Sequence, residues 1–211
     1  MSRLAETPIS GFSRIFLAGL LVLLFAACSR TPSLARLAPD DVVLAFGDSL
    51  TAGVGAEPDQ AYPAQLASLI GRQVVNAGVS GETTAEGLAR LGEQLDEHSP
   101  RLLLLCLGGN DMLRHQPAAA TAANLRAMVR LARDRGVAVV LIGVPQPSLL
   151  GGAPAFYKEI AREFGLAYEG EAFVDVLHDR QLKSDLIHAN AEGYRRVAER
   201  LAGLLREAGA V

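Results

Sequence analysis

The sequence has 211 residues, a formal net charge of −3 and a 50% share of apolar residues. Its length fits one domain, and its apolar share excludes a disordered chain. The near-neutral charge and the absence of tryptophan argue against a nucleic-acid partner, because nucleic-acid-binding proteins show a basic excess and stacking aromatic side chains. A mean hydropathy of +0.23 raises the question of a membrane segment.

The most apolar segment lies at the start of the chain. Arg3 and Arg14 precede an uncharged run over 15–28. This run is shorter than the roughly 20 residues that a membrane-spanning helix needs. The basic start, the short apolar run and the small residues before Cys28 predict a signal peptide over 1–27 and export to the periplasm. An uncleaved N-terminal anchor is the alternative.

The stretch LFAAC over 24–28 resembles a bacterial lipobox, in which the chain is cut before the cysteine and the cysteine is then acylated. Leucine usually stands three residues before the cysteine, and Phe25 departs from that pattern. We expect residues 28–39, with two prolines, to form a polar tether with a lipid on Cys28. Cys106 lies in an apolar run, and we expect it to be a buried packing residue.

Short apolar runs and segments with helical periodicity alternate along the rest of the chain. In chain order we expect a strand over 41–46, a helix over 60–70, a strand over 73–76, a helix over 83–97, a strand over 101–107, a helix over 117–135 that ends at Gly136, a strand over 137–144, a helix over 155–164, a strand over 166–168 and a helix over 190–208. Strands without polar alternation are buried on both faces, so this order predicts a parallel sheet between helices. Functional residues should then follow the carboxyl ends of the strands.

Ser49 follows the first strand, in the stretch Gly-Asp-Ser-Leu over 47–50. A serine at a strand-to-helix turn is exposed as a nucleophile in many hydrolases. The stretch is not a G-x-S-x-G elbow, because position 51 is threonine. A serine that caps the N-terminus of a helix is the equally weighted alternative.

Glycine and asparagine follow the next two strands. Gly78 and Gly81 follow the second strand, where either glycine lets the backbone approach a ligand closely and offers a free N–H group. Asn110 follows the third strand, and its amide is suited to donate to a developing oxyanion. Simple turns are the alternative in both places.

An aspartate and a histidine stand three residues apart near the C-terminus, at Asp185 and His188. The carboxylate can fix the imidazole tautomer while the other ring nitrogen takes a proton from a hydroxyl group. A surface pair ahead of a helix capped by Asn190 is the alternative. His115 is the only competing base, since it alone of the other histidines follows a strand-end loop. Together the residues after the strands supply what acyl transfer requires.

Four blocks of the sequence resemble those of the SGNH (GDSL) hydrolases. They are FGDSLTAGVGA, VVNAGVSGETT, LGGND and SDLIHANAEGYRRVAERL, and they span residues 42–205. The greatest similarity is to secreted bacterial arylesterases, lysophospholipases and acyl-thioesterases. The resemblance implies a flavodoxin-like three-layer α/β/α sandwich with a central parallel sheet over residues 40–211.

The resemblance also implies a role for each candidate residue. Ser49 would be the nucleophile, His188 the base and Asp185 its partner. Ser49 and Gly81 would donate backbone N–H groups to the oxyanion hole, and Asn110 would donate its side-chain amide. The last block often reads Asp-Gly-x-His-Pro, and here Leu186 and Ala189 replace the glycine and the proline, which we expect to alter loop rigidity without loss of activity. Asp48 and Asp111 are expected to be structural.

The expected function is that of a monomeric serine esterase that needs no metal or cofactor. Its substrates would be acyl or aryl esters, lysophospholipids and acyl thioesters. A carbohydrate O-deacetylase that acts on cell-envelope glycans is the alternative, because it uses the same catalytic groups. The acyl pocket is expected between residues 146–158 and the segments after Gly53 and Asn110, with walls formed by Leu149, Leu150, Phe156 and Tyr157. Packing of a helix against the sheet is the other interpretation of these four side chains.

Overall fold

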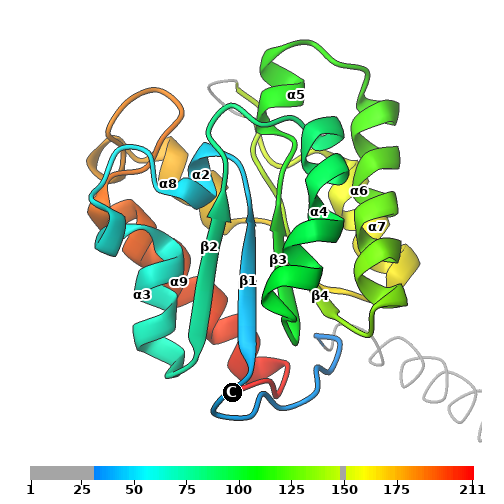
Figure 1. The fold of residues 1–211 in the computed structure, drawn as a ribbon. Helices are drawn as coiled ribbons and strands as arrows, with labels where there is room; N and C mark the ends of the chain where they lie inside the picture. Colours follow the sequence, from blue (N-terminus) through cyan, green and yellow to red (C-terminus); the bar gives the residue numbers. More distant parts are fainter. Residues whose placement is uncertain (1–30, 148–150) are drawn as a thin grey trace, which may run out of the picture. The chain divides into compact units, whose positions relative to one another are not determined.

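The apolar runs form a parallel five-stranded sheet in a computed structural model that describes residues 31–147 and 151–211 (Figure 1). The strands are β1 (Val42–Gly47), β2 (Gln73–Gly78), β3 (Leu102–Cys106), β4 (Ala138–Ile142) and β5 (Ala167–Glu169), in the spatial order β2-β1-β3-β4-β5. All four pairings are parallel. This is the flavodoxin-like order, in which the chain changes direction between β1 and β3. Every residue of β3 is buried, as its unbroken apolar sequence predicts.

Helices cover both faces of the sheet. On one face α3 (Tyr62–Ile70), α8 (Ala172–His178) and α9 (Ala191–Glu207) pack together, and on the other lie α4 (Thr84–His98), α6 (Ala118–Asp134) and α7 (Ala155–Phe164) (Figure 1). Two short helices, α2 (Ser49–Ala52) and α5 (Gly109–Leu113), and the 3₁₀ turns η1 (Pro58–Gln60) and η2 (Arg180–Leu182) complete the chain. The predicted α/β/α sandwich is therefore confirmed. The short helices α2, α5 and α8 are not among the predicted elements.

The segment before β1 is attached to the end of the chain. The N–H of Leu34 donates to the carbonyl of Ala208 at 2.9 Å, and the N–H of Leu37 donates to the carbonyl of Ala210 at 2.8 Å. Leu37 is buried, so contacts of the domain begin before the predicted boundary at residue 40, inside the predicted tether. Both ends meet beside the amino ends of β3 and β4.

Several predictions fall on residues that the structure does not describe. They are the signal peptide over 1–27, the lipidation site at Cys28 and the pocket walls Leu149 and Leu150. Among the described residues, no helix combines the length and the apolar character that crossing a membrane requires. Cys106 is a fully buried free thiol in β3, as predicted.

Candidate active site

Ser49 begins the short helix α2 directly after β1. The residue that caps this helix is Asp48, whose Oδ1 accepts a hydrogen bond from the N–H of Leu50 at 3.0 Å. The interpretation of Ser49 as the helix cap is therefore wrong, because its neighbour holds that position. The Ser49 hydroxyl is left to contact other groups at the carboxyl end of the sheet.

Ser49, His188 and Asp185 form one hydrogen-bonded series. The Oγ of Ser49 lies 3.0 Å from the Nε2 of His188, and the Nδ1 of the same ring lies 2.7 Å from the Oδ2 of Asp185. The other carboxylate oxygen of Asp185 accepts from the N–H groups of Ile187 and His188, each at 2.8 Å. Partial desolvation raises the pKa of Asp185, but the hydrogen bonds from His188 and Ile187 outweigh it, so that pKa lies below its ordinary value. Asp185 is thus held as an ionised partner for the imidazole.

The turn that carries His188 is fixed on both sides. Lys183 and Ala189 form an antiparallel bridge across it. Asn190 caps α9 as predicted, with its Oδ1 accepting from the N–H of Gly193 at 2.9 Å. The competing base, His115, lies in an exposed turn after α5 with a φ of 54°, and the structure places His188 against Ser49 instead.

The two candidate glycines after β2 differ in what their N–H groups bind. The N–H of Gly78 donates to the side chain of Asn76 at 3.0 Å. Neither Gly81, at a φ of 82°, nor Ser49 donates its backbone N–H to any other group within residues 31–147 and 151–211. The two free donors are therefore those of Ser49 and Gly81, and Gly78 has a steric role.

Substitution of Gly78 by alanine should destabilise the protein by about 2 kcal/mol and weaken activity. A Cβ on Gly78 would lie 2.1 Å from the backbone N of Ala52, so α2 and Ser49 would have to move. Urea denaturation and ester hydrolysis measure the two effects. Gly203→Ala is the matched control, because open space surrounds that position in α9 and alanine favours the helix. Equal stability of the two variants would contradict this steric role.

Asn110 is held between two acceptors at the start of α5. Its Nδ2 donates to the backbone carbonyl of Glu82 at 3.0 Å and lies 3.3 Å from the Oδ2 of Asp48. The loop that contains Glu82 is itself anchored by Arg90, whose Nη2 donates to the Glu82 carboxylate at 2.8 Å and to the carbonyl of Ala77 at 2.8 Å. Arg90 also stacks over the ring of Phe46. This anchor was not predicted, because its residues come from separate elements.

The two flanking aspartates are buried and hydrogen-bonded. Burial raises the pKa of Asp48 to about 7, although the hydrogen bond from Leu50 and the nearby His188 lower it in part. Asp111 accepts from the backbone N–H of Thr84 at 2.8 Å and from the hydroxyl of Thr121 at 3.3 Å. Asp111 therefore ties α5 to α4 and α6, in the structural role predicted for it.

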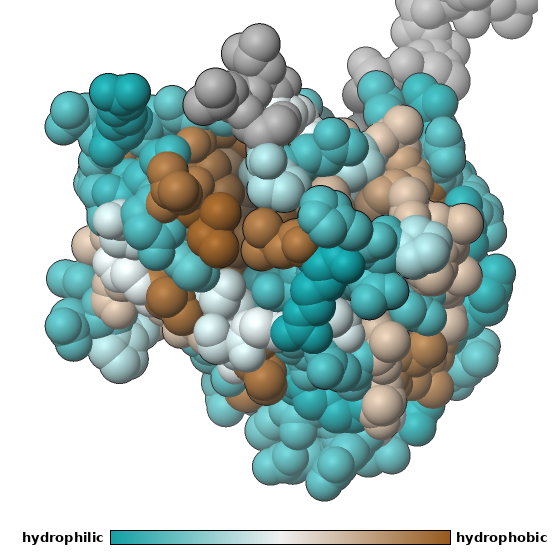
Figure 2. Space-filling view, turned by 90° about the horizontal axis from the view of Figure 1, so that it is seen from above, coloured by the Kyte–Doolittle hydropathy of each residue, from teal (hydrophilic) through white to brown (hydrophobic). Residues whose placement is uncertain are grey.

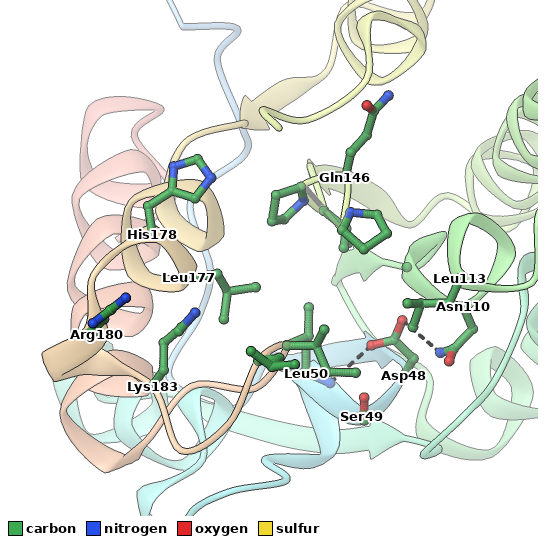
Figure 3. Close-up of a pocket in the computed structure, with 16 residues that line it drawn as sticks. Asp48, Ser49, Leu50, Asn110, Leu113, Gln146, Leu177, His178, Arg180 and Lys183 are labelled. Carbon is green, nitrogen blue, oxygen red and sulfur yellow. Dashed lines mark hydrogen bonds between the residues drawn. The ribbon is translucent and has the colours of Figure 1, made fainter. Parts of the chain in front are cut away.

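A cavity of about 520 Å³ opens beside Ser49 (Figure 3). Its apolar lining comes from five parts of the chain, and consists of Leu50, Leu113, Val144, Pro145, Pro147, Leu177, Leu186 and Ile187. Gln146, His178, Arg180 and Lys183 also line it. Figure 3 shows His178, Arg180 and Lys183 on one side of the cavity, across from Gln146 and Asn110.

The predicted pocket walls are correct only in part. Of the described residues in 146–158, which exclude 148–150, only Gln146 and Pro147 line the cavity, and the segment after Gly53 does not. Tyr157 is buried and donates its hydroxyl to the carbonyl of Leu107 at 2.8 Å, and Phe156 packs against the core. The wall role is therefore wrong for these two residues, which pack α7 against the sheet. The contribution of α8 and η2 was missed because this short segment shows too few turns for a periodic signal.

A serine, an imidazole and a carboxylate in series at the carboxyl end of a parallel sheet define a serine hydrolase. The model of the GDSL-like lipase/acylhydrolase family matches residues 45–196. The chain belongs to this family, that of the SGNH esterases.

Individual relatives agree with this assignment. Esterase TesA of Pseudomonas aeruginosa is 36% identical over 68% of this chain and 73% of its own. Thioesterase 1/protease 1/lysophospholipase L1 of Escherichia coli K12 is 32% identical over 81% of this chain and 86% of its own. A crystal structure of TesA superposes with a TM-score of 0.71, at 30% identity, over 80% of this chain and 99% of that one.

Proposed function

We propose that the protein hydrolyses acyl esters through an acyl-enzyme on Ser49. The observation that carries this is the 3.0 Å separation between the Ser49 hydroxyl and the Nε2 of His188. The imidazole takes the hydroxyl proton as the serine oxygen attacks the substrate carbonyl. Asp185 holds the ring by its Nδ1 and stabilises the imidazolium that forms.

Three donors would bind the oxyanion of the tetrahedral intermediate. The N–H groups of Ser49 and Gly81 have no acceptor among the described residues, so they are available without breaking a bond. Asn110 would exchange its longer contact, the 3.3 Å one to Asp48, for the oxyanion and keep its bond to the Glu82 carbonyl. One such donor is worth roughly 3 kcal/mol of transition-state stabilisation.

Two proton transfers complete the cycle. His188 gives its proton to the leaving alcohol or thiol as the tetrahedral intermediate collapses to the acyl-enzyme. Water then attacks the acyl carbonyl while the same nitrogen takes a proton from it, and collapse of the second intermediate frees the acid and restores the Ser49 hydroxyl.

The cavity supports substrates with an extended apolar acyl or aryl group. Its volume of about 520 Å³ and its leucine, valine and proline lining exceed what an acetyl group fills. Aryl esters, lysophospholipids and acyl thioesters therefore fit better than the acetylated glycans of an O-deacetylase. The relatives named esterase, arylesterase and thioesterase 1/protease 1/lysophospholipase L1 support the same classes.

Hydrolysis of p-nitrophenyl esters with acyl chains from two to sixteen carbons tests this choice. We expect kcat/KM to rise by about ten-fold for roughly every two added methylene groups until the cavity is filled, because each buried methylene contributes ~0.8 kcal/mol. Ser49→Ala, which lacks the nucleophile, is the blank. Activity restricted to the acetyl ester would instead favour the O-deacetylase.

We also propose export to the periplasm, cleavage before Cys28 and acylation of that cysteine, with the enzyme domain as a monomer. The basic start, the apolar run over 15–28 and the lipobox-like LFAAC support this. Cys28→Ala should therefore move the protein from the membrane fraction to the soluble periplasmic fraction, which immunoblotting of fractionated cells measures. Unchanged partitioning would contradict lipidation.

A further inference from the structure

Three exposed large apolar side chains, Leu113, Leu186 and Ile187, line the cavity. Within residues 31–147 and 151–211, six large apolar side chains are at least about one-third exposed, namely Val54, Leu69, Val79, Leu113, Leu186 and Ile187. Only Leu69 lies on the outside of a long helix, α3. The other five belong to the turns and to the short helix α5 that follow strands or precede His188. Single exposed apolar residues are ordinary, whereas a group at one end of a domain marks a binding surface.

Leu186 is the most exposed of the group, at 87%. It lines the cavity together with Leu113 and Ile187. Figure 2, which looks onto this end of the domain, shows apolar groups gathered near its centre with hydrophilic groups around them. The apolar lining of the cavity thus continues outward onto the surface.

Positive charge lies beside the apolar rim of the cavity, which we define as Leu113, Leu186 and Ile187. Arg180 and Lys183 line the cavity, and neither has a carboxylate within 4.0 Å among the residues that the structure describes. The nearby acids are engaged locally, since Asp179 accepts from the N–H of Gln181 and Asp185 binds His188. Among the described residues that line the cavity, the only carboxyl group is that of Asp48, which is buried.

We propose that this face docks on a lipid surface with anionic phosphate headgroups. Leu186 and Ile187 would enter the acyl boundary, while Arg180 and Lys183 would bind headgroup phosphates. An apolar insertion flanked by cations is the usual chemistry of such docking. An amphiphilic substrate could then pass from the lipid layer into the cavity beside Ser49. A second copy of the chain is the other occupant that this face could take, and the experiment below distinguishes it from a lipid surface.

A single introduced tryptophan tests the proposal, because the chain contains none. Leu186→Trp places the probe on the rim, and Leu69→Trp is the matched control at an exposed leucine outside it. Both are made in the full chain with Ser49→Ala and Cys28→Ala, so the result depends neither on catalysis nor on a lipid attached to Cys28. Emission is followed as vesicles of phosphatidylcholine, with or without phosphatidylglycerol, are added, and brominated lipid serves as a quencher.

We expect a blue shift of about 10 nm for Leu186→Trp with the mixed vesicles, with quenching by brominated lipid and a smaller effect with phosphatidylcholine alone. Adding Arg180→Ala and Lys183→Ala should weaken vesicle affinity by about thirty-fold, because each cation near an anionic surface contributes about 1 kcal/mol. The proposal is overturned if Leu186→Trp shows no shift or if Leu69→Trp shifts equally. A shift that grows with protein concentration without lipid would overturn it in favour of a second copy.

Discussion

Replacement of His188 by alanine should lower kcat for ester hydrolysis by about three orders of magnitude or more. The variant keeps the Ser49 hydroxyl but loses the only imidazole within hydrogen-bond distance of it among the described residues. The hydroxyl then has no base at neutral pH, and the leaving group has no acid. The oxyanion donors remain, so some hydrolysis above the rate in water should persist.

Hydrolysis of one p-nitrophenyl ester measures the activity of the variant, and far-ultraviolet circular dichroism measures whether it is folded. His115→Ala is the matched control, because His115 is exposed and lies apart from Ser49 in a turn after α5. It should retain activity within about two-fold of the original protein. A larger loss in His115→Ala than in His188→Ala would contradict the assignment of the base.

Substitution of Asp48 by asparagine should stabilise the protein at pH 8 while lowering its activity. The folded-state pKa of Asp48 is raised from 3.8 to about 7. Below pH 3.8 the carboxyl is protonated in both states and carries no penalty. As pH rises toward 7 the unfolded chain ionises first, so the original protein loses stability over this window, by roughly 4 kcal/mol in total. Asparagine does not titrate and avoids that loss.

The same substitution should weaken catalysis through Asn110. Asparagine can still cap α2 with its amide oxygen, but it has no second acceptor for the Nδ2 of Asn110. Urea denaturation at pH 5 and pH 8, beside kcat/KM at both, measures the two effects. Asp59→Asn, at an exposed carboxyl, is the control. A stability difference from the original protein that is the same at both pH values would contradict burial of an ionising carboxyl at position 48.

Much of the fold follows from the sequence because the three central strands, β1, β3 and β4, are apolar throughout. Leu102–Cys106 and Ala138–Ile142 have no polar alternation, and burial on both faces leaves them few alternatives to a parallel sheet between helices. The site residues could be predicted from the sequence for a related reason. Ser49, Gly81 and Asn110 follow three neighbouring strands, and parallel strands end at one edge of the sheet.

Contacts between segments distant in the sequence could not be predicted in the same way. The hydrogen bond from Arg90 to the Ala77 carbonyl and the one from the Tyr157 hydroxyl to the Leu107 carbonyl join segments whose approach depends on packing. The sequence predicts Tyr157 as a pocket wall because an aromatic side chain suits both an acyl pocket and a helix packed against a sheet. The helix over Ala172–His178 has seven residues, and so short a segment shows fewer than two full periods of an apolar face.

The pairing of Leu34 and Leu37 with the last residues of the chain determines how the domain can be attached to a support. Both ends emerge beside the amino ends of the strands, whereas Ser49 and its cavity lie at the carboxyl ends. A bead, an affinity tag or a fused carrier joined ahead of Thr31 or after Val211 is therefore attached at the amino-end side of the sheet, opposite the opening of the cavity beside Ser49. Immobilised in this way, the enzyme would present its mouth outward to the solution.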